Sequence, residues 1–194
     1  MNAEIKQNPT PSLLKSRLQL LALAAVFIGP FAAAALMFHS GGWRPPGTTN
    51  NGELLNPPVQ LPAGPLASTT GVLQDALRGQ WRILYLERGE CGDTCRDTLI
   101  QIRQVRLATG RDIDRVARLF FGNDIPDEDW FAASQAGLVA AQIGYNTELA
   151  ETLAAFDTGL YLIDPAGQLM MRYAIGTESK EIYDDLHKLL KQTR

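Results

Sequence analysis

The sequence predicts an α/β domain, with a central sheet flanked by helices, preceded by a single transmembrane helix and an extended linker. Three features lead to this prediction. They are a long uncharged apolar run, an alternation of strand-like and helix-like segments after residue 80, and two cysteines where the first such strand meets the first such helix. We divide the chain into an N-terminal tail (1–17), a transmembrane helix (18–38), a linker (39–70) and a folded domain (71–194).

Residues 18–38 read LQLLALAAVFIGPFAAAALMF and carry no charge. About 20 apolar residues, at a rise of about 1.5 Å each, match the roughly 30 Å hydrocarbon core of a bilayer. Gly29 and Pro30 lie in the middle of the run, where a membrane helix tolerates them as a kink. This segment therefore predicts a single-pass membrane anchor.

Basic residues set the expected orientation of that anchor. Lys6, Lys15 and Arg17 precede the apolar run, whereas only Arg44 follows it closely. Because positive charge is enriched on the cytoplasmic side of membrane proteins, we expect the tail in the cytoplasm. The domain would then face the periplasm, or the extracytoplasmic side, of a bacterial inner (cytoplasmic) membrane.

A cleaved signal peptide is the alternative, since the small residues of AAAAL could form part of a cleavage site. We favour an uncleaved anchor because the apolar run exceeds the about 7–15 residues of a signal-peptide core. Residues 1–17 also precede the run, which is a long leader for a signal peptide. The domain is exported under either interpretation.

Residues 39–70 are rich in Gly, Pro, Asn and Thr and show no periodic apolar pattern. Such a composition favours an extended linker that lifts the domain off the bilayer. Within it, residues 52–62 (GELLNPPVQLP) are a candidate for a first irregular strand packed on the domain surface.

The folded domain shows a recognisable order of elements. Its β-branched and aromatic content predicts a first strand at residues 81–87, and a helix at 96–108 follows with Leu99, Ile102 and Val105 on one apolar face. The other expected elements are strands at 115–121, 160–163 and 168–175, alanine-rich helices at 129–142 and 146–155, a turn at 164–167, and a closing amphipathic helix at 178–190. This β–α–β–α–β–β–α order, with cysteines at the first strand-to-helix junction, is the thioredoxin arrangement.

Cys91 and Cys95 lie at the start of the expected helix, in Cys-Gly-Asp-Thr-Cys. The N-terminus of a helix presents free N–H groups and the positive end of the helix dipole, which stabilise a thiolate. A thiolate attacks disulfides or binds soft metal ions. An inert structural disulfide is the alternative, but so short a ring restrains the unfolded chain only weakly. We therefore favour a redox or metal role for the pair.

A single anchor, a strand, Cys-x-x-x-Cys at the start of a helix and the late hairpin YLIDPAG together resemble the Sco/SenC copper-chaperone proteins. The resemblance covers roughly residues 80–190, and the pair combined with the late turn is more specific than the pair alone. It implies an exported thioredoxin-like protein that helps to assemble the copper centre of cytochrome c oxidase. It also implies Cys91 and Cys95 as candidate copper ligands.

The resemblance stops at the histidine with which Sco proteins complete their copper site. The matching position falls at Phe156, or at Asp157 with a slip of one residue, and no histidine lies between His39 and His187. Gly92 also stands where that family usually has a proline. The resemblance therefore supports the fold and the pathway more strongly than it supports copper binding.

Other side chains are weak replacements for that histidine. We expect His187 on a polar stripe of the closing helix and His39 at the exit from the membrane. Met170 and Met171 are soft donors, but neighbours in a strand face opposite sides, so one of them is expected in the core. Asp157 is a hard ligand, poorly suited to Cu(I).

Composition excludes several classes of function. A net charge of −3 indicates no nucleic-acid partner. Two cysteines cannot form a four-cysteine zinc site or a framework of several disulfides. Trp130 and Phe131 are interpreted as core residues. Five arginines are interpreted as solvated rather than as a site for an anionic partner: Arg103, Arg106, Arg111, Arg115 and Arg118.

These inferences predict a thiol–disulfide exchange protein of respiratory oxidase assembly, which as an enzyme would be a thiol–disulfide oxidoreductase. Cys91 would attack a partner disulfide, and Cys95 would resolve the mixed disulfide. The expected client is an oxidase subunit or a copper chaperone with a cysteine pair. Two alternatives stay open: a Cu(I) carrier that uses the same cysteines and one unidentified ligand, and a non-catalytic assembly scaffold. Copper is the cofactor that the resemblance implies.

Overall fold

The computed structural model describes residues 13–39, 49–125 and 128–193. The chain divides into two compact units, with the boundary between Thr48 and Thr49. The first unit contains helix α1 (Leu13–His39), which encloses the apolar run and has Pro30 inside it. Among the described residues, this is the one helix long and apolar enough to cross a membrane. Its apolar side chains are exposed, as expected of a helix whose surroundings are lipid.

The second unit is built on a mixed sheet with the strand order β1-β8-β7-β4-β5-β6 over the described residues. Strand β4 pairs in parallel with β5, and β5 with β6, whereas β7, β8 and β1 add on antiparallel. A short hairpin of β2 and β3 forms a separate sheet. The strands are β1 (Glu53–Gln60), β2 (Leu66–Ser68), β3 (Gly71–Leu73), β4 (Trp81–Glu87), β5 (Val116–Gly122), β6 (Leu138–Gln142), β7 (Gly159–Ile163) and β8 (Gln168–Tyr173).

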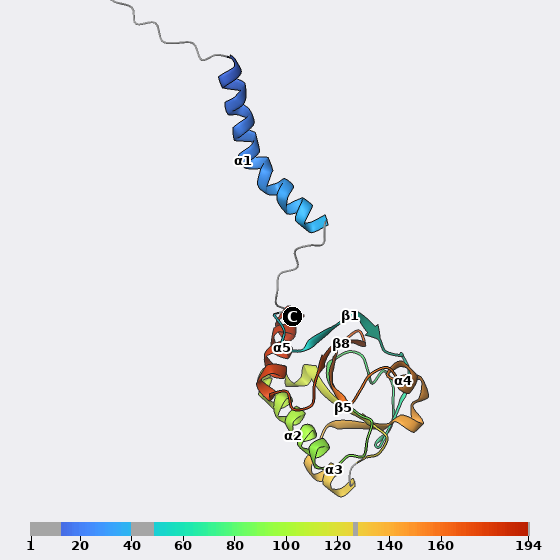
Figure 1. Cartoon of the computed structure of the whole chain (residues 1–194). Coiled ribbons are helices and arrows are strands. Elements are labelled where there is room, and N and C mark those ends of the chain that lie inside the picture. The colour runs from blue at the N-terminus through green and yellow to red at the C-terminus, as the bar shows by residue number, and fades with distance from the viewer. Residues whose placement is uncertain (1–12, 40–48, 126–127, 194) are drawn as a thin grey trace, which may run out of the picture. The chain divides into compact units, whose positions relative to one another are not determined.

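Helices cover both faces of this sheet, with α2 and α5 side by side on one face and α4 on the other (Figure 1). The helices are α2 (Asp93–Ala108), α3 (Glu128–Ser134), α4 (Thr147–Thr152) and α5 (Ser179–Gln192), with short 3₁₀ turns η1 (Gly110–Arg115) and η2 (Ile143–Tyr145). Each face carries its own hydrophobic core. Every residue of β4 is buried, because a central strand covered on both sides leaves no polar face. The thioredoxin-like arrangement is confirmed.

One expected helix is partly a strand. We expected a helix over residues 129–142, but α3 ends at Ser134 and residues 138–142 form β6. Gly137, with a φ of +76°, breaks the helix between them. Ala140 and Ala141 are fully buried beside β5, so tertiary packing overrides their helix propensity. The next helix is also shorter than expected, since α4 covers only Thr147–Thr152.

The segment that we expected to be a linker contributes to the fold. Residues 53–60 form β1, the edge strand beside β8, and the second compact unit begins at Thr49 rather than at residue 71. The expectation of an irregular strand within residues 52–62 is confirmed, and its register shifts between Leu54 and Val59. A linker prediction is therefore retained only for residues 40–48, which lie outside the described residues.

Candidate redox site

The two cysteines lie where β4 leads into α2, at the point that the sequence indicates. They form a disulfide, and their Cα atoms are 5.1 Å apart. Helix α2 begins at Asp93, with Gly92 in the N-cap position and no side chain capping the free N–H groups. The helix therefore begins three residues earlier than the expected 96–108. The uncapped N–H groups and the helix dipole therefore lie beside the sulfurs, where they favour a thiolate.

Burial distinguishes the two sulfurs. Cys95 is 2% exposed and belongs to the core beneath α2, together with Tyr85 and Leu99. Cys91 is only half-buried and packs against the edge of that core. A larger molecule can therefore reach Cys91 more easily than Cys95. This is the asymmetry that an attacking and a resolving cysteine require.

A buried carboxylate at the end of β4 was missed by sequence reasoning. The side chain of Glu87 is buried, and its Oε2 accepts a hydrogen bond of 2.5 Å from the Tyr85 hydroxyl. Its Oε1 accepts bonds from the Gly89 N–H at 2.9 Å and the Thr158 hydroxyl at 3.2 Å. Burial raises the pKa of Tyr85, and the hydrogen bond to Glu87 raises it further. The available signal was an acidic residue at the end of a strand whose preceding four residues, Ile83 to Leu86, carry no charge.

Arg88 joins the loop before the cysteines to the segment that precedes β7. Its backbone N–H donates to the Thr158 hydroxyl at 3.0 Å, and its Nε donates to the Phe156 carbonyl at 3.3 Å. Its Nη2 also donates to the Leu153 carbonyl. The segment around Phe156 is therefore tied to the loop that leads to Cys91. This is the segment in which the Sco-like pattern would place its histidine.

The side chains at that position do not offer a soft metal ligand. Phe156 packs edge-on against Tyr161, with the ring centroids 5.7 Å apart. Asp157 is exposed, and its carboxylate lies 3.5 Å from the guanidinium of Arg172. Neither residue resembles a Cu(I) ligand in chemistry or in environment.

The other candidate ligands lie in separate contexts. His187 is half-buried on α5 and stacks on Tyr183, with the ring centroids 5.3 Å apart. His39 is the last residue of α1, and its side chain lies outside the described part. Met170 and Met171 both pack against the core beneath α2 and α5. We expected them to face opposite sides, but a register shift in the pairing of β7 with β8 at this point upsets the alternation.

The two cysteine sulfurs are therefore the candidate copper ligands that remain. Within residues 13–39, 49–125 and 128–193, no group of three His, Cys, Asp or Glu side chains is placed to hold a metal ion. Cu(I) prefers soft thiolate, thioether or imidazole donors, and in the part of the chain described no histidine joins the two sulfurs in such a group. We derive no chemical step through copper.

Aromatic and basic residues flank the site. The guanidinium of Arg96, which follows Cys95, lies 5.4 Å from the ring centroid of Trp130 on α3, a cation–π distance. Trp130 and Phe131 are half-buried against the core beneath α2, which agrees with their interpretation as core residues.

Among the five arginines interpreted as solvated, Arg118 is instead fully buried, and that interpretation is wrong for it.

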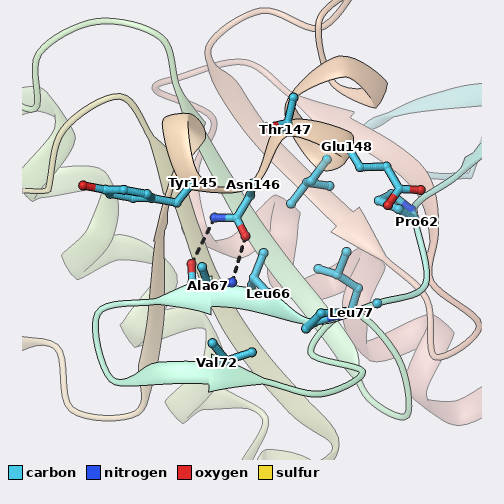
Figure 2. A pocket seen from close by; sticks show the side chains of 12 residues that line it. Pro62, Leu66, Ala67, Val72, Leu77, Tyr145, Asn146, Thr147 and Glu148 are labelled. Atoms are coloured by element: carbon cyan, nitrogen blue, oxygen red, sulfur yellow. Dashed lines mark hydrogen bonds between the residues drawn. The ribbon is translucent and has the colours of Figure 1, made fainter.

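A separate cleft of about 330 Å³ lies between the β2–β3 hairpin and the η2–α4 segment (Figure 2). The side chain of Asn146 fixes its floor by accepting from the Ala67 N–H at 2.8 Å and donating to the Ala67 carbonyl at 3.0 Å. Pro62, Leu66 and Val72 contribute apolar lining. Neither cysteine lines this cleft, so it is not part of the redox site.

The fold and the site define a thioredoxin-fold protein with a candidate membrane anchor and a disulfide at the start of its first domain helix. Residues 81–193 match the family model described as transmembrane-like, thioredoxin-like, C-terminal domain, and residues 15–41 match the corresponding transmembrane-like N-terminal domain. The chain belongs to this transmembrane-like, thioredoxin-like family. A search of curated protein sequences found no match.

Solved structures with the same fold include Sco proteins. Apo Sco1 of Thermus thermophilus is 16% identical over 74% of this chain and 99% of its own, with a TM-score of 0.58. Yeast Sco1 with copper bound is 18% identical over 69% of this chain and 90% of its own, with a TM-score of 0.56. The thioredoxin domain of a thiol-disulfide oxidoreductase from Bacteroides vulgatus is 16% identical over 67% and 94%, with a TM-score of 0.50. At these identities the likeness establishes the fold, and the Sco/SenC resemblance of the fold is confirmed.

Proposed function

We propose that this chain is a membrane-anchored thiol–disulfide exchange protein that acts in the assembly of the copper centre of a respiratory oxidase. The observation that carries the proposal is the Cys91–Cys95 disulfide at the start of α2, with one accessible and one buried sulfur. A structural staple gains nothing from this asymmetry, whereas an exchange reaction depends on it.

The reaction runs in two balanced steps from the reduced form. The Cys91 thiolate attacks a client disulfide, forming a mixed disulfide and releasing one client thiolate. The Cys95 thiolate then attacks the Cys91 sulfur, which closes the intramolecular disulfide and releases the second client thiolate. The client gains two electrons, the protein loses two, and the released thiolates take up two protons. A dithiol reductant must return the pair to its starting state.

The proposed client is the cysteine pair of an oxidase copper-site subunit or of a copper chaperone. Such cysteines bind copper only as thiolates, so in an oxidising compartment they must be kept reduced before metal arrives. Two observations support this pathway: the fold is shared with Sco proteins, several of them solved with copper bound, and α1 is long and apolar enough to anchor the domain in a membrane. We place the domain on the periplasmic side of a bacterial inner membrane, because the basic residues precede the apolar run.

Disulfide transfer tests this function. The full chain, reduced in detergent micelles, is mixed with an oxidised peptide that carries a copper-site cysteine pair, and both redox states are followed by mass spectrometry. The expected result is loss of the peptide disulfide with formation of the Cys91–Cys95 disulfide in equal amounts. Cys91→Ser should abolish transfer, whereas Thr94→Ser, between the two cysteines on the first turn of α2, should retain it. Wild-type protein that leaves the peptide oxidised would overturn the proposal.

A Cu(I) carrier is the second candidate, favoured by the copper-bound Sco structures with the same fold. An anaerobic Cu(I) titration of the reduced full chain separates the two functions. Tight one-to-one binding that is lost in both Cys91→Ser and Cys95→Ser supports the carrier. Weak binding, together with efficient disulfide transfer, supports the exchange function.

A further inference from the structure

A buried cation without an acidic partner lies beneath the loop that joins α3 to β6. Arg118, on β5, is 1% exposed. Its Nη1 donates to the Gln135 side-chain oxygen at 2.8 Å, and its Nη2 donates to the Ala136 carbonyl at 2.8 Å. Its Nε has no partner, and Arg118 forms no ion pair with any residue that the structure describes.

Arg118 remains charged at neutral pH. Burial, and then the positive charges of Arg106 and Arg103 on α2, lower the pKa of Arg118 to about 10. A buried cation normally has a counter-ion, because removing a charge from water costs several kcal/mol that neutral oxygens only partly recover. Here the charges that act on Arg118 are those of Arg106 and Arg103, which are also positive and supply no counter-ion.

A cavity of about 330 Å³ is lined by Gln135 and Ala136, the two residues that accept hydrogen bonds from the Arg118 guanidinium. Ile125, Phe131 and Leu138 give it apolar walls, and Thr69 contributes to its rim. Gln135 is 2% exposed and lines the cavity, and its side-chain nitrogen has no hydrogen-bond partner. The cavity is therefore lined by a buried residue whose amide has two unused donors and whose oxygen accepts a hydrogen bond from the guanidinium.

We propose that this cavity binds a carboxylate group attached to a short apolar chain. Rotation of the Gln135 side chain turns its N–H₂ group toward the cavity, where the carboxylate accepts it with the charge of the Arg118 guanidinium behind Gln135, while the apolar chain contacts Phe131 and Leu138. The carboxylate supplies the counter-ion that Arg118 lacks and satisfies the unpaired donors.

The charge of the site favours a monoanion. A phosphate or sulfate would carry a second charge into a cavity with apolar walls and one buried cation, which adds a desolvation cost without a partner. Asp124 lies next to Ile125, where its carboxylate accepts the Ile125 N–H, but it is exposed and its repulsion is screened by solvent. Two sources offer the required chemistry: a free short-chain acid, and the terminal carboxylate of a protein that ends in an apolar residue.

Butyrate is the probe, with butyramide as its uncharged equivalent. The full chain in detergent micelles is labelled with ¹⁵N, and the side-chain amide resonances of Gln135 are followed during the titration. The expected result is a saturable shift with butyrate and none with butyramide. Equal shifts with both compounds, or a shift that does not saturate, would overturn the proposal.

Variants test the assignment of the site. Gln135→Glu places a carboxylate against Arg118 within the chain, so it should abolish butyrate binding and raise the thermal unfolding midpoint. Gln135→Leu removes the donors and should weaken binding at least tenfold. Arg111→Gln, at an exposed arginine, should bind as the wild type does. Undiminished binding to both Gln135 variants would contradict the proposal.

Two further experiments identify the source of the carboxylate and show whether its binding depends on the cysteines. A peptide ending in valine should compete with butyrate when its carboxylate is free and not when it is amidated, if the natural ligand is a chain terminus. Butyrate binding without peptide competition assigns the site to a free acid. Cys91→Ser should bind butyrate as the wild type does, because neither cysteine lines the cavity. The carboxylate site and the exchange function are therefore tested independently of each other.

Discussion

Glu87 determines how the loop before the cysteines is held. It lies at the end of β4, where the buried strand opens into the loop, and it accepts hydrogen bonds from Tyr85, Gly89 and Thr158. These three donors come from the strand, the loop and the segment before β7. One carboxylate therefore fixes the positions of three elements around Cys91.

Glu87→Gln should destabilise the domain. The amide keeps the size of the side chain but replaces one acceptor oxygen with a donor, so at least one buried partner loses its bond at a cost of about 1–3 kcal/mol. Chemical unfolding of the full chain in detergent measures the change. Glu90→Gln, three residues further on and exposed, is the matched control and should leave the free energy of unfolding unchanged. Equal effects of the two substitutions would contradict this account.

Buried tyrosines predict a loss of stability at alkaline pH. Burial is the main cause that raises the pKa of Tyr85 and of Tyr173 above the ordinary value of 10.0. Since the unfolded tyrosines release their protons first, the stabilisation is complete below about pH 10 and declines as the pH rises further.

The measurement is the unfolding free energy of the oxidised chain between pH 8 and 11. Tyr173→Phe should show a shallower decline above about pH 10 than the wild type, because it has one fewer such group. Tyr145→Phe, at an exposed tyrosine, is the control and should follow the wild type. An alkaline slope that Tyr173→Phe leaves unchanged would contradict the assignment.

Among the elements, β1 and α5 are joined by one buried carboxylate. Asp185 on α5 is 2% exposed and accepts the backbone N–H groups of Asn51 at 2.7 Å and Gly52 at 2.9 Å. It also accepts the Tyr173 hydroxyl at 3.1 Å. The start of the edge strand is therefore fixed to the last helix, and the folded unit begins where these bonds form.

Asp185→Asn should destabilise the domain by about 1.5–3 kcal/mol, because hydrogen bonds to a charged group are lost and one donor is left facing an amide N–H₂ group. The neighbouring Asp184 lies on the same helix with its side chain 37% exposed and pairs with Lys180, so Asp184→Asn is the matched control with no expected change. Unfolding by denaturant measures both variants. An Asp185→Asn protein as stable as the wild type would show that this carboxylate does not hold β1.

The elements with clear periodicity could be predicted from the sequence. Helix α2 was recovered because its apolar residues repeat with the period of a helix, and strand β4 was recovered from its β-branched and aromatic content. Strand β6 was missed because Ala140 and Ala141 are buried by a neighbouring strand, which an alanine-rich sequence does not reveal. The pairing of β1 with β8 joins segments more than 100 residues apart, and local patterns do not encode such contacts.

Only part of the candidate site could be predicted, because local sequence patterns do not encode contacts between distant segments. Cys91 and Cys95 are only four positions apart in sequence, so the strand-to-helix junction that carries them could be recognised from their spacing alone. The roles of Glu87 and Arg118 depend on side chains that approach from other elements, such as Thr158 and Gln135. Arg118 lies at the end of an arginine-rich segment, and its sequence context alone does not distinguish it from the solvated arginines nearby.

In the whole molecule, the fold does not depend on the disulfide. The domain has a hydrophobic core on each face of its sheet, whereas the bridge spans only four positions along the chain. A loop of this size should contribute at most about 2 kcal/mol through chain entropy. We therefore expect the domain to stay folded whether the pair is oxidised or reduced.

The double variant Cys91→Ser/Cys95→Ser tests that independence. It should fold with a free energy of unfolding lower than that of the oxidised wild type by no more than about 2 kcal/mol. Circular dichroism and denaturant unfolding in detergent measure both quantities. Failure of the double variant to fold would assign the pair a structural role and favour the non-catalytic scaffold.

The central claim is that Cys91 attacks a client disulfide and Cys95 resolves the product. Trapping the mixed disulfide tests it most directly. The reduced full chain carrying Cys95→Ser is mixed with an oxidised client peptide, and covalent adducts are counted by mass spectrometry under non-reducing conditions. We predict a stable adduct on Cys91 in this variant, and little or none in Cys91→Ser. An adduct that forms equally well in Cys91→Ser, or no adduct in either variant, would contradict the account.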